Sequence, residues 1–87
     1  IVPPKIAGHV VIAGFGLNGK NLARVLKAAG IVYRVIELNA RSLREARERN
    51  DEVIFGDCTR REVLHAAGIE HARVLVVAIS DAAATRR

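Results

Sequence analysis

The 87-residue sequence lacks methionine and tryptophan, and only 3% of its residues are aromatic. Hydrophobic residues nevertheless make up 51% of the chain, so the core must be built from valine, isoleucine, leucine and alanine. That mixture is typical of parallel strands and of the helices that cover them. The composition therefore favours an α/β fold, and the length allows one small domain but not two.

Cysteine is also scarce, because Cys58 is the single one; it cannot form an internal disulfide and suggests a reducing compartment. No apolar run approaches the roughly 20 residues that a membrane-spanning helix needs, and no signal peptide is recognisable. The chain has no initiator methionine and stops just after the expected start of a helix. We therefore expect it to be a fragment of a longer protein.

The stretch from Val10 to Gly19 has the pattern of a strand, a glycine-rich loop and the start of a helix. Gly14, Gly16 and Gly19 follow the G-x-G-x-x-G pattern of dinucleotide-binding folds. In that pattern the first glycine makes the tight turn, the second lets backbone approach a pyrophosphate, and the third lets the helix pack on the sheet. The phosphate then lies at the helix N-terminus, where free N–H groups and the helix dipole stabilise an anion.

A glycine-rich turn between a strand and a helix can also serve packing alone, so the surrounding pattern has to decide. Glu37 ends a second strand-like run, 18 residues after Gly19. This is the expected position of a carboxylate that accepts hydrogen bonds from an adenosine ribose. The succession of strand, helix, strand and acid favours nucleotide binding over a purely structural turn.

Strand and helix patterns alternate along the chain after a linker over residues 1–8. Strands are predicted at His9–Ala13, Val32–Glu37, Val53–Phe55 and Arg73–Ile79. Helices are predicted at Asn18–Ala29, Ala40–Arg49 and Arg60–Ala67, and a fourth begins at Ser80-Asp81. The buried face of the first helix is expected to contain Leu22, Val25, Leu26 and Ala29.

The ends of these helices carry recognisable capping residues. Gly30 and Gly68 are expected to end two helices in the left-handed conformation. Asn39 is expected to cap the second helix, and Thr59 with Glu62 to form a capping box on the third.

Short loops and right-handed crossovers predict a parallel sheet with strand order 3-2-1-4. This is a Rossmann-like doubly wound sheet, truncated to about four strands. Ligands bind such folds outside the carboxyl ends of the strands. The glycine loop, Glu37, Asp57-Cys58 and Ser80-Asp81 should all lie there, and this convergence is the strongest functional indication in the sequence.

The formal net charge of +5 is compatible with a nucleic acid, an anionic ligand or a membrane surface. The second helix interleaves arginines with Glu45 and Glu48, which predicts Arg41–Glu45 and Arg44–Glu48 pairs worth about 0.2–0.5 kcal/mol each. We interpret this helix as a solvated face. A nucleic-acid surface would not intersperse carboxylates, and it would offer stacking aromatics.

Four short motifs follow one another along the chain in this order: Val-Ile-Ala-Gly-Phe-Gly, Val-Ile-Glu, Gly-Asp-Cys-Thr and Val-Leu-Val-Val-Ala-Ile-Ser-Asp. From residue 9 onward the chain resembles the RCK domain, also called the TrkA N-terminal domain, and most of all that of Kef-type cation:proton antiporters. The resemblance implies a nucleotide-sensing domain over residues 9–87 that gates potassium transport. It also implies a membrane transport partner, a location on the cytoplasmic face and homodimerisation through the complete domain. A complete domain of this family has further strands and a dimer-forming helix that this chain lacks.

By the same resemblance the glycine loop holds the ligand phosphates, Glu37 the ribose, and Asp57 with the Cys58 backbone the adenine end. The implied ligand is NAD(H), with AMP, ADP or ATP as alternatives. The predicted cofactor-binding residues are Gly14, Phe15, Gly16, Leu17, Asn18, Gly19, Glu37, Leu38, Asp57, Cys58 and Ser80. No catalytic or metal-ligating residue is predicted. Asn39 stands where the family often has a second acid, which leaves the ligand preference open.

Several of these residues also have an ordinary structural interpretation. Asp57 can brace a turn instead of meeting a ligand, and Cys58 is either a redox-sensitive thiol at a helix start or an inert loop residue. Arg60 and Arg61 can reach a phosphate or simply lie exposed at a helix start. The three histidines, His9, His65 and His71, have no metal-ligand spacing and are expected at the surface.

Three classes of function are compatible with this pattern. A ligand-sensing regulatory domain is favoured, because the motif supplies binding groups and nothing visible supplies a catalytic acid, base or metal. The cofactor-binding half of an NAD-dependent oxidoreductase is the alternative, since a substrate domain can lie elsewhere in the parent chain. Nucleic-acid binding is disfavoured because no recognition motif is present.

Overall fold

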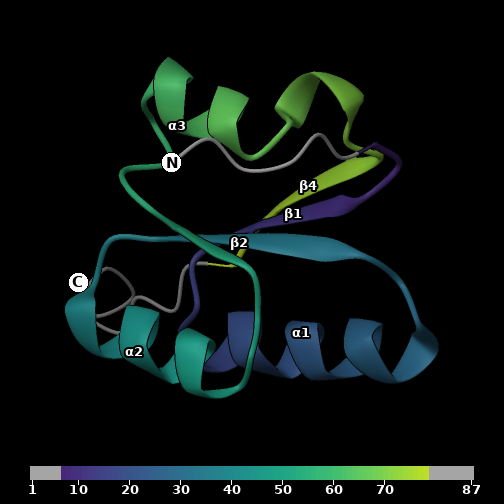
Figure 1. Ribbon diagram of the computed structural model, residues 1–87, viewed down its shortest axis with the longest axis vertical. Helices are drawn as coiled ribbons and strands as arrows, with labels where there is room; N and C mark the ends of the chain where they lie inside the picture. Colours follow the sequence, from purple (N-terminus) through teal and green to yellow (C-terminus); the bar gives the residue numbers. More distant parts are fainter. Residues whose placement is uncertain (1–6, 79–87) are drawn as a thin grey trace, which may run out of the picture.

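A computed structural model describes residues 7–78 as a four-stranded parallel sheet with helices on both faces (Figure 1). The strands are β1 (Val10–Ala13), β2 (Tyr33–Glu37), β3 (Val53–Phe55) and β4 (Val74–Val77). On one face lie helices α1 (Leu17–Ala29) and α2 (Ala40–Glu48); on the other lie α3 (Arg61–Ala66) and the 3₁₀ turn η1 (Ile69–His71). The order β3-β2-β1-β4 confirms the predicted topology.

The centre of the sheet is β1, which pairs with β2 on one side and with β4 on the other. All four of its residues are buried, as its continuous apolar run predicts for a strand covered on both faces. β4 is shorter than the predicted strand and much more exposed, with Val77 exposed by 60%. Within residues 7–78, β4 is an edge strand, which explains its exposure. None of the helices in this part of the chain is long and apolar enough to cross a membrane.

The buried face of α1 differs from the prediction. Gly19, Ala23 and Leu26 face the sheet, whereas Val25 is 62% exposed and Ala29 is also exposed. The small residues allow the helix axis to approach the sheet closely, and Val25, two residues after the buried Ala23, lies on the far side of the helix. Leu26 is buried and Leu22 packs against the core as predicted, and Gly19 packs on the sheet as the motif predicts, but the prediction missed Ala23.

The helix ends confirm two predictions and correct one. Gly30 and Gly68 are both left-handed with φ of 73°, and the Asn39 side chain accepts a hydrogen bond from the Ser42 N–H at 3.1 Å. The predicted capping box on α3 is wrong, because the N-cap is Arg60 and it makes no side-chain hydrogen bond. Thr59 instead donates to Asp57. The predicted linker over 1–8 lies largely outside the described residues, and the predicted fourth helix at Ser80-Asp81 lies wholly outside them.

The predicted ion pairs within α2 are wrong as well. The Glu45 carboxylate lies 2.9 Å from Lys20 Nζ of α1, and this hydrogen bond lowers the pKa of Glu45. Neither Arg41–Glu45 nor Arg44–Glu48 is within ion-pair distance in the described part of the chain. Packing of α2 beside α1 therefore gives Glu45 a partner on the neighbouring helix.

His9 is fully buried, which corrects the prediction that it lies at the surface. Its Nε2 is 2.7 Å from the carbonyl oxygen of Ala67, just after α3, and Arg34 Nη1 donates to the carbonyl of Ala66 at 3.2 Å. The last carbonyls of a helix lack intrahelical donors, so a buried helix end needs such partners. His9 and Arg34 thus hold the C-terminal end of α3 on the sheet. The other two histidines are exposed.

At the amino ends of the strands, away from the glycine loop, the buried carboxylate of Asp51 joins three segments of the chain. Asp51 accepts a hydrogen bond from the Tyr33 hydroxyl of β2 and forms ion pairs with Lys27 of α1 at 3.0 Å and with Arg49 at 3.1 Å. Burial raises the pKa of the Asp51 carboxyl, but the hydrogen bonds from Tyr33, Lys27 and Arg49 outweigh it and hold the pKa below its usual range. Burial and the bond to Asp51 raise the pKa of Tyr33 to about 12.

We expect Asp51→Ala to lower the free energy of unfolding by about 3 kcal/mol, because it leaves buried donors without their acceptor. A carboxyl whose pKa is lowered on folding stabilises the fold above its unfolded pKa, and that contribution is lost as the pH falls through the folded value. Urea unfolding at neutral and acidic pH measures both effects. Glu48→Ala, which removes an exposed carboxylate, is the control. Equal losses in the two variants, or an unchanged acid sensitivity in Asp51→Ala, would contradict this role.

Candidate functional site

Two adjoining hollows lie at the carboxyl ends of the strands. The first, of about 250 Å³, lies at the glycine loop; its lining consists of Gly14, Phe15, Gly16, Glu37, Asn39, Ser42 and Ala78. The second, of about 160 Å³, lies where β2 and β3 end; its lining consists of Ala13, Gly14, Ile36, Glu37, Leu38, Gly56, Asp57 and Cys58. Gly14 and Glu37 line both hollows, so the glycine loop, Glu37 and the Asp57-Cys58 loop meet at one edge. Ser80 lies outside the described residues.

The glycine loop is shaped by two glycines with different duties. Gly14 has a φ of 110°, a conformation that other residues rarely adopt, and it turns the chain sharply off β1. Gly19 lies in the first turn of α1, where a Cβ atom would come within 2.1 Å of the Gly14 carbonyl oxygen. Gly19 therefore lets α1 pack against the turn, in the role that the motif assigns to its third glycine.

The N-terminus of α1 is open, and this feature suits an anion. Its N-cap is Gly16, which has no side chain to bond the first N–H groups, and the first turn contains no acidic residue. The N–H groups of Leu17, Asn18 and Gly19 therefore lack the intrahelical acceptors that later residues have. The neighbouring α2 differs, because the Asn39 side chain caps it. Of these two helix starts, α1 is the one with backbone donors left for a phosphate.

Glu37 connects the end of β2 to the glycine loop. Its Oε1 accepts a hydrogen bond from the Phe15 N–H at 2.6 Å, and its Oε2 accepts from the N–H groups of Leu38 and Asn39, both at 2.8 Å. A carboxylate has about four lone-pair sites, so Glu37 retains capacity for a further donor such as a ribose hydroxyl. The residue is only partly exposed. Glu37 can therefore hold the loop in place and meet a ligand at the same time.

The Asp57-Cys58 loop lies on the far side of Glu37. Asp57 Oδ1 accepts hydrogen bonds from the Thr59 N–H at 2.9 Å and from its hydroxyl at 2.8 Å, and these bonds lower the Asp57 pKa. Asp57 thus braces the turn, while its exposed position at the hollow leaves the ligand role open. Cys58 is half-buried and packs against the small core around Val11 and Ile36.

The remaining predicted residues occupy distinct places. The Phe15 ring is fully buried in the core, so only its backbone is available at the loop. Leu17 and Leu38 are exposed by 65% and 55%; Leu38 lines the second hollow, whereas Leu17 lines neither. Asn39 and Ser42, at the start of α2, line the first hollow but were not predicted as site residues. The predicted Asn39 cap is the sequence feature that could have identified these two residues, because it fixes the first turn of α2 beside Glu37.

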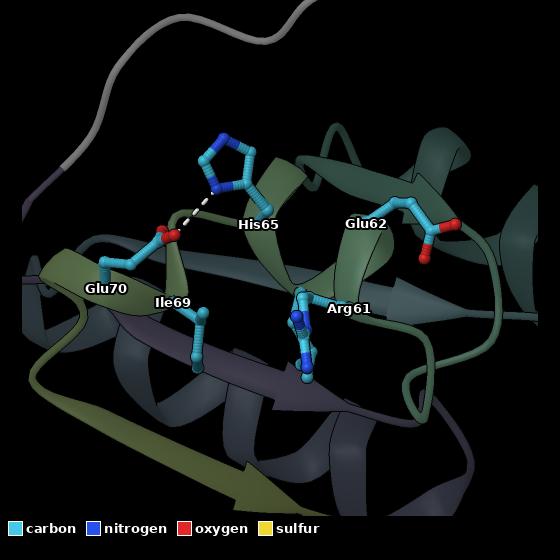
Figure 2. A pocket seen from close by; sticks show the side chains of 6 residues that line it. Arg61, Glu62, His65, Ile69 and Glu70 are labelled. Atoms are coloured by element: carbon cyan, nitrogen blue, oxygen red, sulfur yellow. Dashed lines mark hydrogen bonds and ion pairs between the residues drawn. The ribbon is translucent and has the colours of Figure 1, made fainter.

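A further hollow of about 710 Å³ lies over α3 and η1, on the face of the sheet opposite to α1 and α2. Figure 2 shows His65 and Glu70 turned toward each other there, with His65 Nδ1 2.7 Å from Glu70 Oε2. Glu62, another residue of its lining, lies 3.7 Å from Arg60, which is outside the lining. Although this hollow is larger, it contains none of the predicted site residues. Among residues 7–78, no three His, Cys, Asp or Glu side chains are grouped so as to hold a metal ion.

A parallel sheet in the order 3-2-1-4, with a glycine-rich turn into an uncapped helix and an acid at the end of the next strand, defines a Rossmann-like domain. The sequence profile of the TrkA-N domain family matches residues 10–87. The chain belongs to the TrkA-N domain family, which confirms the resemblance found in its sequence.

The relatives of this chain include Kef-type potassium-efflux proteins. It is 37% identical over 76 residues to the putative K(+) efflux antiporter KefB of Alkalimonas amylolytica, covering 87% of this chain and 12% of the relative. The TrkA-N domain of the inner membrane protein ybaL from Escherichia coli matches with a TM-score of 0.77 and 30% identity, covering 83% of this chain and 53% of that one. The chain thus spans only a small part of the transporter that it resembles.

Two further solved structures carry nucleotides. The Shewanella denitrificans Kef CTD in its AMP-bound form matches with a TM-score of 0.64 and 30% identity, covering 83% of this chain and 42% of that one. The GsuK channel bound to NAD shares the fold with a TM-score of 0.74 at 24% identity, covering 84% of this chain and 14% of that one. The fold of this chain is therefore one that holds AMP and NAD in other proteins.

Proposed function

We propose that this chain is the N-terminal part of a nucleotide-sensing regulatory domain. It binds NAD(H) or an adenosine nucleotide at the carboxyl edge of its sheet. In the parent protein, or in an associated subunit, it controls potassium or cation transport through a membrane domain from the cytoplasmic face, and the complete domain forms a homodimer. The full-length relatives are potassium-efflux proteins, which favours this function over the cofactor half of an NAD-dependent oxidoreductase.

The open N-terminus of α1 beside Glu37 carries the proposal. Phosphate oxygens accept hydrogen bonds from the free N–H groups after Gly16, where the helix dipole also favours negative charge. Glu37 lies at the next strand end and takes a ribose hydroxyl. The second hollow, which Leu38 and Cys58 line, receives the adenine. The AMP and NAD of the two solved relatives share this adenosine phosphate.

Calorimetric titration with AMP, NADH and NADPH tests the proposal and its specificity. We expect NADH to bind at least about tenfold more tightly than NADPH, because the 2′-phosphate would place like charge against the Glu37 carboxylate, and such contacts cost several kcal/mol. Glu37→Gln keeps an acceptor for the Phe15 N–H but removes the charge, so it should narrow the difference in affinity between NADH and NADPH.

Arg41 is the residue that could offset this preference. It is exposed in the first turn of α2, and among residues 7–78 it has no carboxylate within ion-pair distance, although its charge acts on Glu45. Its guanidinium group can therefore meet a 2′-phosphate. Arg41→Ala is therefore the companion variant, and it should leave NADH binding unchanged. Equal or tighter binding of NADPH by the parent chain would contradict the assignment of Glu37. No binding of AMP or NADH would contradict the proposed function itself.

A further inference from the structure

The positive charge of the described chain is concentrated in one layer. Helices α1 and α2 together contain six basic and two acidic residues, whereas the other residues between 7 and 78 include five basic and six acidic ones. Both helices lie on the same face of the sheet (Figure 1). That face carries the excess of positive charge, and the face of α3 and η1 does not.

The lysines of this layer have internal partners. Lys20 reaches Glu45 of α2 at 2.9 Å, and Lys27 donates to the Arg49 carbonyl at 2.8 Å besides pairing with Asp51. These contacts tie α1 to α2 and to the segment after it. The lysines therefore act within the layer and contribute less to its outer surface.

Four arginines of the layer behave differently. These four residues are Arg24, Arg41, Arg44 and Arg47. They are exposed, and none has a carboxylate within ion-pair distance in the part of the chain that the structure describes. Helical periodicity places Arg24 away from the buried Gly19, and Arg44 opposite the buried Ala46. These side chains therefore project away from the sheet, so the outer surface of the layer presents guanidinium groups in excess over the exposed carboxylate of Glu48.

We propose that this arginine surface of α1 and α2 lies against an anionic phospholipid membrane. Guanidinium groups bind phosphate well, and each basic residue near an anionic bilayer strengthens binding about fivefold. Two helices packed side by side offer a broad surface rather than a groove, and neither contains an aromatic residue for stacking on bases. The solved TrkA-N domain that this chain resembles belongs to an inner membrane protein, which supports the presence of a bilayer close to the domain. The proposal does not depend on nucleotide binding, because the glycine loop opens at the strand ends.

Co-sedimentation with vesicles tests this inference. The parent chain should bind vesicles that contain phosphatidylglycerol at low salt, should bind neutral phosphatidylcholine vesicles at least tenfold more weakly, and should be released by high salt. Arg44→Glu with Arg47→Glu should weaken binding to the anionic vesicles at least tenfold. The matched control reverses two exposed arginines outside the layer, Arg61→Glu with Arg73→Glu, and should retain more binding than the layer variant.

Circular dichroism shows whether each variant is folded, and an AMP titration shows whether the nucleotide site is intact, so failure of this inference is separable from failure of the proposed function. Three results would overturn the inference: equal binding to anionic and neutral vesicles, equal losses in the layer variant and its control, or tighter binding to a double-stranded DNA oligonucleotide than to anionic vesicles at the same salt. The last result would assign the surface to nucleic acid instead.

Discussion

Replacing Gly16 with valine should abolish nucleotide binding while the chain remains folded. The residue has a φ of −76°, which any L-residue adopts, so the substitution introduces no left-handed strain. Gly16 lines the hollow in front of the first N–H groups of α1, and a branched side chain there would keep a phosphate from reaching them. Loss of two charge-assisted hydrogen bonds corresponds to an affinity decrease on the order of a hundredfold.

A thermal melt and an AMP titration on the same Gly16→Val protein decide this point. Gly16→Ala is the graded control, because its smaller side chain should reduce affinity less. A melting temperature close to that of the parent chain, together with lost binding, is the expected pair of results. If the affinity of Gly16→Val for AMP is unchanged, the glycine loop serves packing alone.

Gly19→Ala, in contrast to Gly16→Val, should destabilise the fold itself. The added Cβ would lie 2.1 Å from the Gly14 carbonyl oxygen and 3.0 Å from its carbon, and both are backbone atoms that cannot rotate away. Either α1 moves off the sheet or the tight turn at Gly14 opens. We expect a loss of about 3 kcal/mol or more in the free energy of unfolding, at the upper end of what overpacking costs.

Gly30→Ala is the matched control for this variant. Gly30 has a φ of 73°, but a Cβ there meets nothing within 4 Å, so the cost is limited to about 1–2 kcal/mol of backbone strain. Urea unfolding of both variants separates steric overlap from conformational strain. A Gly19→Ala protein as stable as Gly30→Ala would mean that α1 can shift without cost, and that the third glycine of the motif is dispensable here.

Local patterns were sufficient to predict the topology. The alternation of apolar runs and helical segments led to the order 3-2-1-4, and Gly30, Gly68 and Asn39 marked helix ends that the structure confirms. Such signals are local, because a left-handed glycine or a capping side chain acts within one turn of the helix. The same locality explains why the glycine loop and Glu37 could be placed at one edge of the sheet.

Tertiary contacts account for the predictions that were wrong. Glu45 was expected to pair within α2 but bonds to Lys20 of α1, and His9 was expected at the surface but is buried beneath the end of α3. Thr59 was expected to cap α3 but donates to Asp57, two residues before it. In each case a partner became available only when two elements packed together or a loop closed. The interaction of Glu37 with the Phe15 N–H is of the same kind.

A ¹⁵N–¹H correlation NMR titration of the chain with AMP and then with NADH locates the nucleotide site residue by residue. We expect saturable shifts of the amides from Gly14 to Gly19, because phosphate oxygens accept from the start of α1. We also expect them for the amides from Glu37 to Asn39, because the ribose meets Glu37. The amides around the α3–η1 hollow, from Arg61 to Glu70, should stay in place. Largest shifts around that hollow, or no saturable shift in the glycine loop, would contradict the assignment of the nucleotide site.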